Sequence, residues 1–148
     1  MESPAAKAAA ATPLHLTTLF VIDPAMGEVP TVAKASLRCV GQGTLIDVHF
    51  SGLASKAVYT MWLFTTFAAG ATGPSDGSEN VFTSSTSGEG ELTVMVRPTD
   101  QGSFSGTSWP SCIDADNFNF IVIDGHFDGL SHGGFPFPDN HDLLALLP

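Results

Sequence analysis

The sequence predicts an all-β protein, a single antiparallel β-sandwich of about seven strands. Short stretches rich in valine, isoleucine, threonine and aromatic residues recur along the chain, each bounded by turn-forming residues. Stretches with helical periodicity are nearly missing. Charged residues make up 14% of the chain, so serine, threonine, glycine and asparagine must supply much of the polar surface. A small β-barrel is the alternative, because it uses the same short alternating strands.

Alternation of apolar and polar residues locates the strands of the first half. Residues 1–13 are rich in alanine and proline and are expected to form a flexible arm before a sandwich domain at 14–148. Strands are predicted at 14–22, 31–40 and 44–50. In the third of these, alternate apolar residues indicate one buried face and one polar face.

The second half continues in the same way. Residues 58–67 are apolar on both faces, which predicts a strand in the middle of a sheet. Residues 81–85 and 91–97 are predicted to form a hairpin around a glycine-containing turn. Residues 118–124 form the last strong strand, and the closing segment 140–148 is compatible with one helical turn.

One local pattern resembles a known corner of β-sandwich proteins. In SGLASKAVYTMWLF, Leu53 stands six residues before Tyr59, at the start of the most apolar strand. This resembles the tyrosine corner of fibronectin type III and immunoglobulin-like domains, where the tyrosine hydroxyl bonds back to the preceding turn. Ser55 stands where those families usually carry proline. The resemblance covers about 15 residues and implies a fold, not an activity.

Two cysteines, Cys39 and Cys112, are expected to form one disulfide, with two buried free thiols as the alternative. A disulfide, together with few lysines, favours an extracellular, cell-surface or periplasmic protein. The first residues lack the basic and leucine-rich regions of a signal peptide, so we expect a mature amino terminus behind an added methionine, with a disordered alanine- and proline-rich tail as the alternative.

The charge of the chain bears on its partners. Fifteen acidic residues against five basic ones give a formal net charge of −10, which disfavours nucleic acid and anionic membranes and attracts cations or a basic partner. No run of eighteen apolar residues occurs, so no transmembrane helix is expected.

Histidines and aspartates concentrate in the segment GHFDGLSHGGFPFPDNHD. His126, His132 and His141, together with Asp128, are candidate ligands for zinc or copper, and His49 is a further candidate. The spacing fits no compact ligand motif, so a loop whose polar groups satisfy its own backbone is the alternative.

Two smaller patterns carry weaker predictions. Asp47 and His49 lie two residues apart on one strand face, either as its polar half or as an acid–base pair beside a pocket. Residues 114–117 (DADN) predict side-chain-capped turns, with a calcium site as the alternative.

Aromatic residues divide between strands and loops. Those on strong strands are expected in the core, namely Trp62, Phe64, Phe67, Phe118 and Phe120. Trp109, Phe135 and Phe137 lie in loops and are candidates for an exposed recognition patch, with closure of one end of the sandwich as the equal alternative.

The predicted function is a non-catalytic extracellular module for binding or self-assembly, with a protein partner or further copies of itself. Residues 14–22 are the segment expected to add to a neighbour's sheet. One alternative is a small metal-dependent or acid–base enzyme built on His126, His132 and His141. The second alternative is a β-barrel carrier of a small ligand.

Overall fold

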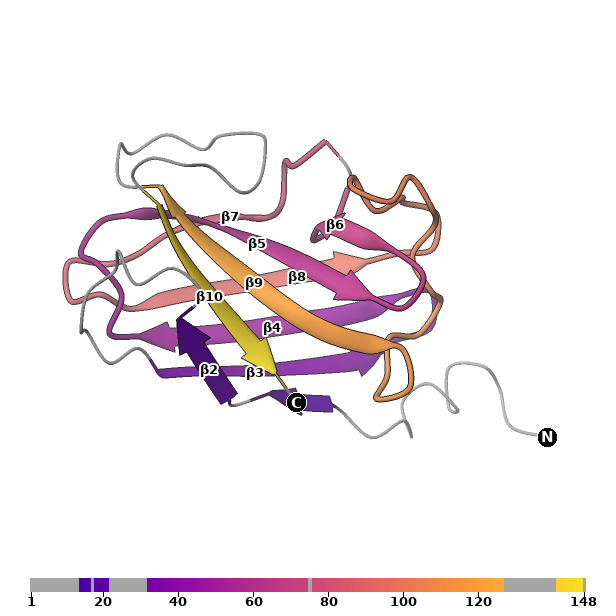
Figure 1. The fold of residues 1–148 in the computed structure, drawn as a ribbon, viewed down its shortest axis with the longest axis horizontal. Coiled ribbons are helices and arrows are strands. Elements are labelled where there is room, and N and C mark those ends of the chain that lie inside the picture. The colour runs from indigo at the N-terminus through magenta and orange to yellow at the C-terminus, as the bar shows by residue number, and fades with distance from the viewer. Residues whose placement is uncertain (1–13, 17, 22–31, 75, 127–140, 148) are drawn as a thin grey trace.

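The computed structural model describes residues 14–16, 18–21, 32–74, 76–126 and 141–147. The described residues form strands and no helix. These strands make two antiparallel sheets packed face to face (Figure 1). This confirms the predicted all-β sandwich. The described strands do not close into a barrel, so the barrel alternative is wrong. The expected arm at 1–13 lies outside the described residues.

The first sheet has four strands in the order β1-β3-β4-β8. Their bounds are β1 Leu14–Leu16, β3 Val32–Cys39, β4 Thr44–Ser51 and β8 Gly90–Val96.

The second sheet has six strands in the order β2-β10-β9-β5-β6, and β7 pairs with β5 beside that path. Their bounds are β2 Thr18–Val21, β5 Val58–Thr65, β6 Ala69–Ala71, β7 Val81–Thr83, β9 Phe118–His126 and β10 His141–Leu147.

The core lies between the two sheets and is built by alternation along each strand. Inward-facing residues of β4, β5 and β9 are almost completely buried; they are Ile46, Val48, Phe50, Tyr59, Met61, Leu63, Ile121 and Ile123. Strand β5 also buries Trp62 on its other face, in a second apolar cluster. The prediction of a central strand apolar on both faces is therefore confirmed.

Three local predictions differ from the structure. The predicted strand 14–22 is divided, because β1 joins the first sheet and β2 the second. Residues 81–97 do not form a hairpin, since β7 pairs with β5 and β8 pairs with β4. Segment 141–147 is a strand between β9 and β2, where ladder hydrogen bonds on both sides outweigh the helix propensity of its leucines.

Two links outside the ladders tie loops to the strands. Cys39, at the end of β3, forms a disulfide with Cys112 across 73 residues, with their Cα atoms 5.2 Å apart. The Ala54 N–H donates to the Tyr59 hydroxyl at 3.1 Å, which is the bond that the tyrosine-corner resemblance implied. None of the described residues forms a helix long and apolar enough to cross a membrane.

Candidate metal centre

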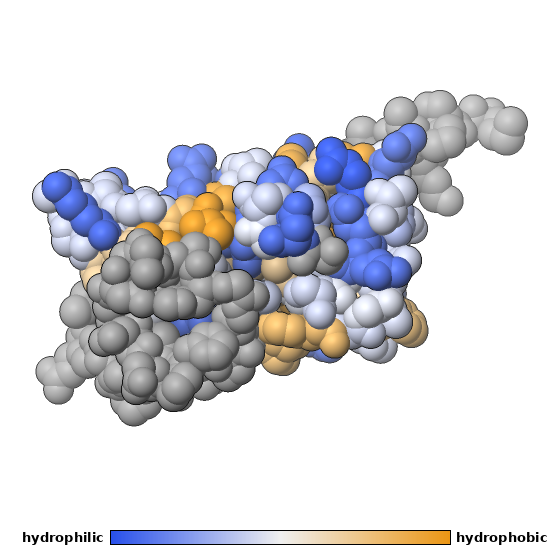
Figure 2. Space-filling view, turned by 90° about the horizontal axis from the view of Figure 1, so that it is seen from above, coloured by the Kyte–Doolittle hydropathy of each residue, from blue (hydrophilic) through white to orange (hydrophobic). Residues whose placement is uncertain are grey.

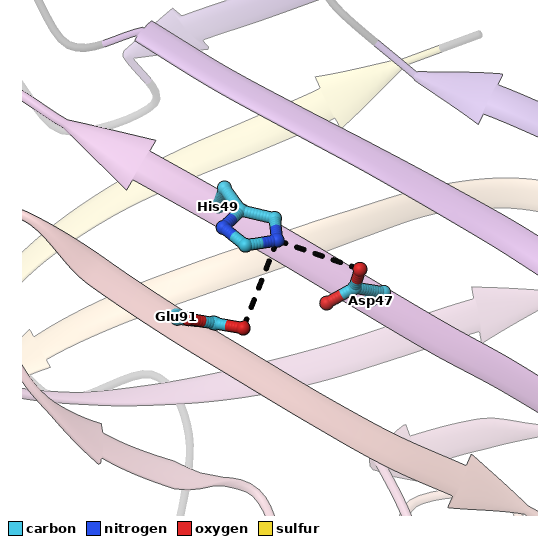
Figure 3. Close-up of side chains that lie close together, drawn as sticks. All are labelled: Asp47, His49 and Glu91. Carbon is cyan, nitrogen blue, oxygen red and sulfur yellow. Dashed lines mark ion pairs between the residues drawn. The ribbon is translucent and has the colours of Figure 1, made fainter.

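A cluster of three side chains of the types that ligate metals lies on the outer face of the four-stranded sheet. Asp47 and His49 project outward from β4 because the residues between and beside them point into the core. The β4–β8 register places Glu91 directly opposite His49. Figure 3 shows the three side chains directed toward one another from these two strands.

The distances within the cluster suit a shared cation. His49 Nε2 lies 3.4 Å from Asp47 Oδ2 and 3.7 Å from Glu91 Oε1. One potential ligand atom from each residue lies within 4.8 Å of the other two. Two ligands bound to a tetrahedral ion at about 2.0–2.1 Å stand about 3.3–3.4 Å apart. The imidazole–carboxylate distances are therefore close to those of a tetrahedral site.

The distance between the carboxylates of Asp47 and Glu91 decides how far the side chains must move to bind one ion. The two carboxylates can lie up to 4.8 Å apart and must come closer around one ion. The side chains of His49 and Glu91 are more than half exposed, at 57% and 64%, which leaves each of them room for a small rotation.

A neighbouring hydroxyl orients one of the carboxylates. Thr93 is the cross-strand partner of Asp47, and its Oγ1 donates to Asp47 Oδ1 at 2.9 Å. Because this bond holds Oδ1, the other carboxylate oxygen of Asp47, Oδ2, faces His49. Partners of this kind fix ligand orientation in metal sites.

Two shallow depressions meet at His49. One, of about 580 Å³, extends from His49 and Glu91 past Glu89 toward Thr83 and Ser85. The other, of about 190 Å³, is lined by His15, Lys34, Ala35, Ser36, Asp47 and His49. Water therefore reaches the cluster from both sides. The geometry suits a surface-bound cation better than acid–base catalysis, which works best in a site that excludes water.

The predicted carboxy-terminal ligands are only partly described. The β9–β10 register places His141 directly opposite His126, so the fold brings the backbones of these two histidines together. His132 and Asp128 lie outside the described residues. His49 belongs to the other sheet and contacts Asp47 and Glu91 instead.

The sequence did not indicate Glu91 as a ligand. It stands 42 positions after His49, and nothing in its own strand distinguishes it from an ordinary exposed residue. Only the pairing of β4 with β8 and their register bring the two together. If the pairing of β4 with β8 were known, imidazole and carboxylate groups at opposite positions of the two strands would identify His49 and Glu91.

The structure changes the aromatic prediction. Trp109 is 1% exposed and packs in the core, so the expectation that it belongs to a surface patch is wrong. Phe135 and Phe137 lie outside the described residues. Phe67, expected in the core, is 67% exposed, and Phe104 is 44% exposed and stacks on the buried Trp62. In Figure 2, hydrophobic residues reach the surface as separate patches among polar ones.

Residues 114–117 form the predicted capped turns. Asp114 Oδ1 accepts hydrogen bonds from the N–H groups of Asp116 and Asn117, at 2.9 and 3.3 Å. Asn117 Oδ1 accepts from the Asp114 N–H at 3.0 Å. These side chains satisfy their own backbone, as expected for turn-forming residues.

Comparisons with protein-family models, with curated proteins and with solved structures return no match to this chain.

Proposed function

We propose that this protein is a non-catalytic extracellular binding module that holds a divalent cation, zinc or copper, on the outer face of its four-stranded sheet. The proposal depends on one observation, the convergence of Asp47, His49 and Glu91 within 4.8 Å. One imidazole and two carboxylates form a mixed nitrogen–oxygen ligand set, which both ions accept. Water or a further ligand completes the coordination.

The wider properties of the chain support the setting and the ligand. The Cys39–Cys112 disulfide is a feature of oxidising compartments, which favours a secreted or cell-surface location. The net charge of −10 raises the local concentration of cations around the molecule. The hydroxyl bond at Tyr59 supports an immunoglobulin-like or fibronectin-like sandwich, a fold widely used for binding.

Self-association remains part of the proposal, but through another segment than 14–22. In the structure β1 and β2 pair with β3 and β10 of the same chain, so these residues complete its own sheets. Strand β8 stands at the end of the four-stranded path and is the better candidate for pairing with a second copy. Size-exclusion chromatography with light scattering would detect such a dimer.

A second candidate cation site retains the carboxy-terminal histidines. The opposed positions of His126 and His141 in adjacent strands favour it, with His132 and Asp128 as the further predicted ligands. Antiparallel partners have Cα atoms about 4.5–5.5 Å apart, so these two positions stand side by side in the sheet.

Zinc titration by calorimetry, with elemental analysis of the dialysed protein, tests both sites. For the first site we expect one zinc equivalent that Asp47→Asn, His49→Ala or Glu91→Gln weakens by more than about tenfold, because losing even an orienting partner costs about 10–100-fold. Thr93→Val, which removes only such a partner, is expected to weaken binding by about tenfold.

Matched variants separate ligation from overall charge. Asp116→Asn and Glu79→Gln each remove one exposed carboxylate outside the cluster and both depressions, and are expected to leave the zinc affinity within about twofold, because exposed charges are strongly screened. Replacing His126, His132 and His141 together by alanine tests the second site. If that triple variant alone abolishes binding, the proposal for Asp47, His49 and Glu91 is wrong.

A further inference from the structure

The smaller depression beside His49 collects hydrogen-bond donors from three strands. His15 of β1, Lys34 and Ser36 of β3, and His49 of β4 line a hollow of about 190 Å³. The register explains this gathering, since Ser36 stands between His15 and Asp47, and Lys34 stands opposite His49. All of these side chains project from the outward face of the sheet.

Lys34 lies where its positive charge would weaken the binding of a cation, if a cation were the only ligand of this region. Its exposed ammonium group lies on the strand next to His49, and within the described ranges it forms no ion pair with a carboxylate. A divalent cation bound nearby would repel it. An anion between the ion and the ammonium group would add two attractions at shorter distances, which offset that repulsion.

The formal charges show when such an anion is favoured. Without a metal, Asp47 and Glu91 make the cluster negative and repel anions. A divalent ion neutralises the two carboxylates, and Lys34 then leaves the hollow with a formal charge of +1. The hollow therefore attracts anions only after the metal has bound.

We propose that this hollow binds a carboxylate group once Asp47, His49 and Glu91 hold a divalent cation. One carboxylate oxygen occupies the metal position that the three side chains leave free, and the other accepts from Lys34 Nζ. Ser36 and His15 supply further donors at the edge of the hollow. This inference rests on the proposed cation site, and it names the ligand class of that site.

Thermodynamic linkage allows carboxylate binding to be tested by measuring the affinity of the protein for zinc. If the metal promotes carboxylate binding, the carboxylate must strengthen metal binding by the same factor. Couplings of this kind are commonly about 5-fold or more. Zinc titrations in acetate and in perchlorate at equal ionic strength, corrected for zinc binding by acetate itself, measure that factor.

The expected result is a zinc dissociation constant about 5-fold lower in acetate than in perchlorate. Lys34→Gln is expected to abolish the difference while binding zinc at least as tightly as the native chain in perchlorate. Arg38→Gln is the matched control, because it removes one positive charge from the same face of β3 four residues away and is expected to preserve the difference.

The source of the carboxylate is tested with a short acetylated peptide whose only carboxylate is its carboxy terminus. Coupling by the peptide, but not by its amide, indicates a polypeptide ligand, whereas coupling by acetate alone indicates a small free carboxylate; either result supports the proposal. Equal zinc affinity in acetate, peptide and perchlorate overturns it and leaves the cation site intact. An equal loss of coupling in Arg38→Gln also overturns it, and failure of zinc to bind in perchlorate overturns both proposals.

Discussion

Tyr59 shows how one polar atom can organise a turn from inside the core. Its ring is fully buried between the sheets and stacks on Phe82 at a centroid distance of 5.5 Å. Its hydroxyl reaches the backbone of Ala54, in the turn before β5. The bond gives a buried oxygen a partner and fixes the direction in which the chain enters the sheet.

Replacing Tyr59 by phenylalanine should lower the free energy of unfolding by about 1–2 kcal/mol, because the Ala54 N–H loses its acceptor. Urea denaturation measures the change, with an unaltered m-value. Thr86→Val, which removes an exposed hydroxyl in a turn, is the control and should change stability by less than about 0.5 kcal/mol. A Tyr59→Phe value within the range of the control would contradict the role of the bond.

Asp76 carries a pH dependence at the same scale. Hydrogen bonds from Ser78 lower the pKa of its carboxyl group below the ordinary value of 3.8. A folded-state pKa below the unfolded one means that the carboxylate stabilises the fold above about pH 3.8. That contribution is lost as the pH falls through the folded pKa.

Asp76→Asn should therefore be less stable than the native chain near neutral pH, and the difference should shrink as the pH falls below 3.8. Urea denaturation across this pH range measures it. Asp116→Asn, at another exposed acidic position, provides the comparison. A stability difference for Asp76→Asn that stays constant with pH would disprove the assignment.

At the scale of elements, close packing of β5 on β9 depends on a glycine. Gly125 stands opposite Tyr59 in the ladder, and a Cβ atom there would lie 2.8 Å from Tyr59 Cε1. The tyrosine ring thus occupies the space that a side chain on β9 would need. The same register that aligns these two strands also brings His126 to the end of the ladder.

Gly125→Ala should lower the free energy of unfolding by about 1–3 kcal/mol, because the ring or the strand must move to admit the methyl group. Thermal and urea unfolding measure the loss. Asn119→Ala, at an exposed position of the same strand, is the control and should have a small effect. A neutral or stabilising Gly125→Ala would show that the two strands tolerate a wider separation.

At the scale of the whole molecule, the disulfide joins the end of β3, in the four-stranded sheet, to the loop that leads into β9 of the six-stranded sheet. The two cysteines stand 73 residues apart in the sequence. Trp109 and Ile113 pack in the core on either side of Cys112. The disulfide therefore restrains the loop between β8 and β9. Among the described residues of that loop, the bridge between Gln101 and Ser108 is the one strand-like pairing.

Replacing both cysteines by serine should cost about 4 kcal/mol, the loop-closure entropy expected for a loop of this length. Chemical denaturation of the native and double-variant proteins measures the cost. Adding a reductant should destabilise the native protein but leave the variant unchanged. A loss under about 1 kcal/mol would indicate that the loop is held by its core residues alone.

The sequence by itself determined the fold class, the central strand β5, the disulfide pair and the turn at Tyr59. Each of these depends on local alternation, on turn-forming residues or on a count of two cysteines. Alternation also placed Asp47 and His49 on one outward face. Alternation and turn signals act over a few residues, and a count of two cysteines leaves one possible pair, so none of them needs knowledge of the partner strands.

Only the tertiary structure decided which strands pair and in what register. It divided residues 14–22 between two sheets, separated β7 from β8, and turned 141–147 into a strand. It buried Trp109 and brought Glu91 opposite His49. Strand pairing depends on contacts between residues distant in the chain, which compete across the whole molecule. For that reason two of the three residues of the candidate metal centre, Asp47 and His49, were apparent from the sequence, and Glu91 was not.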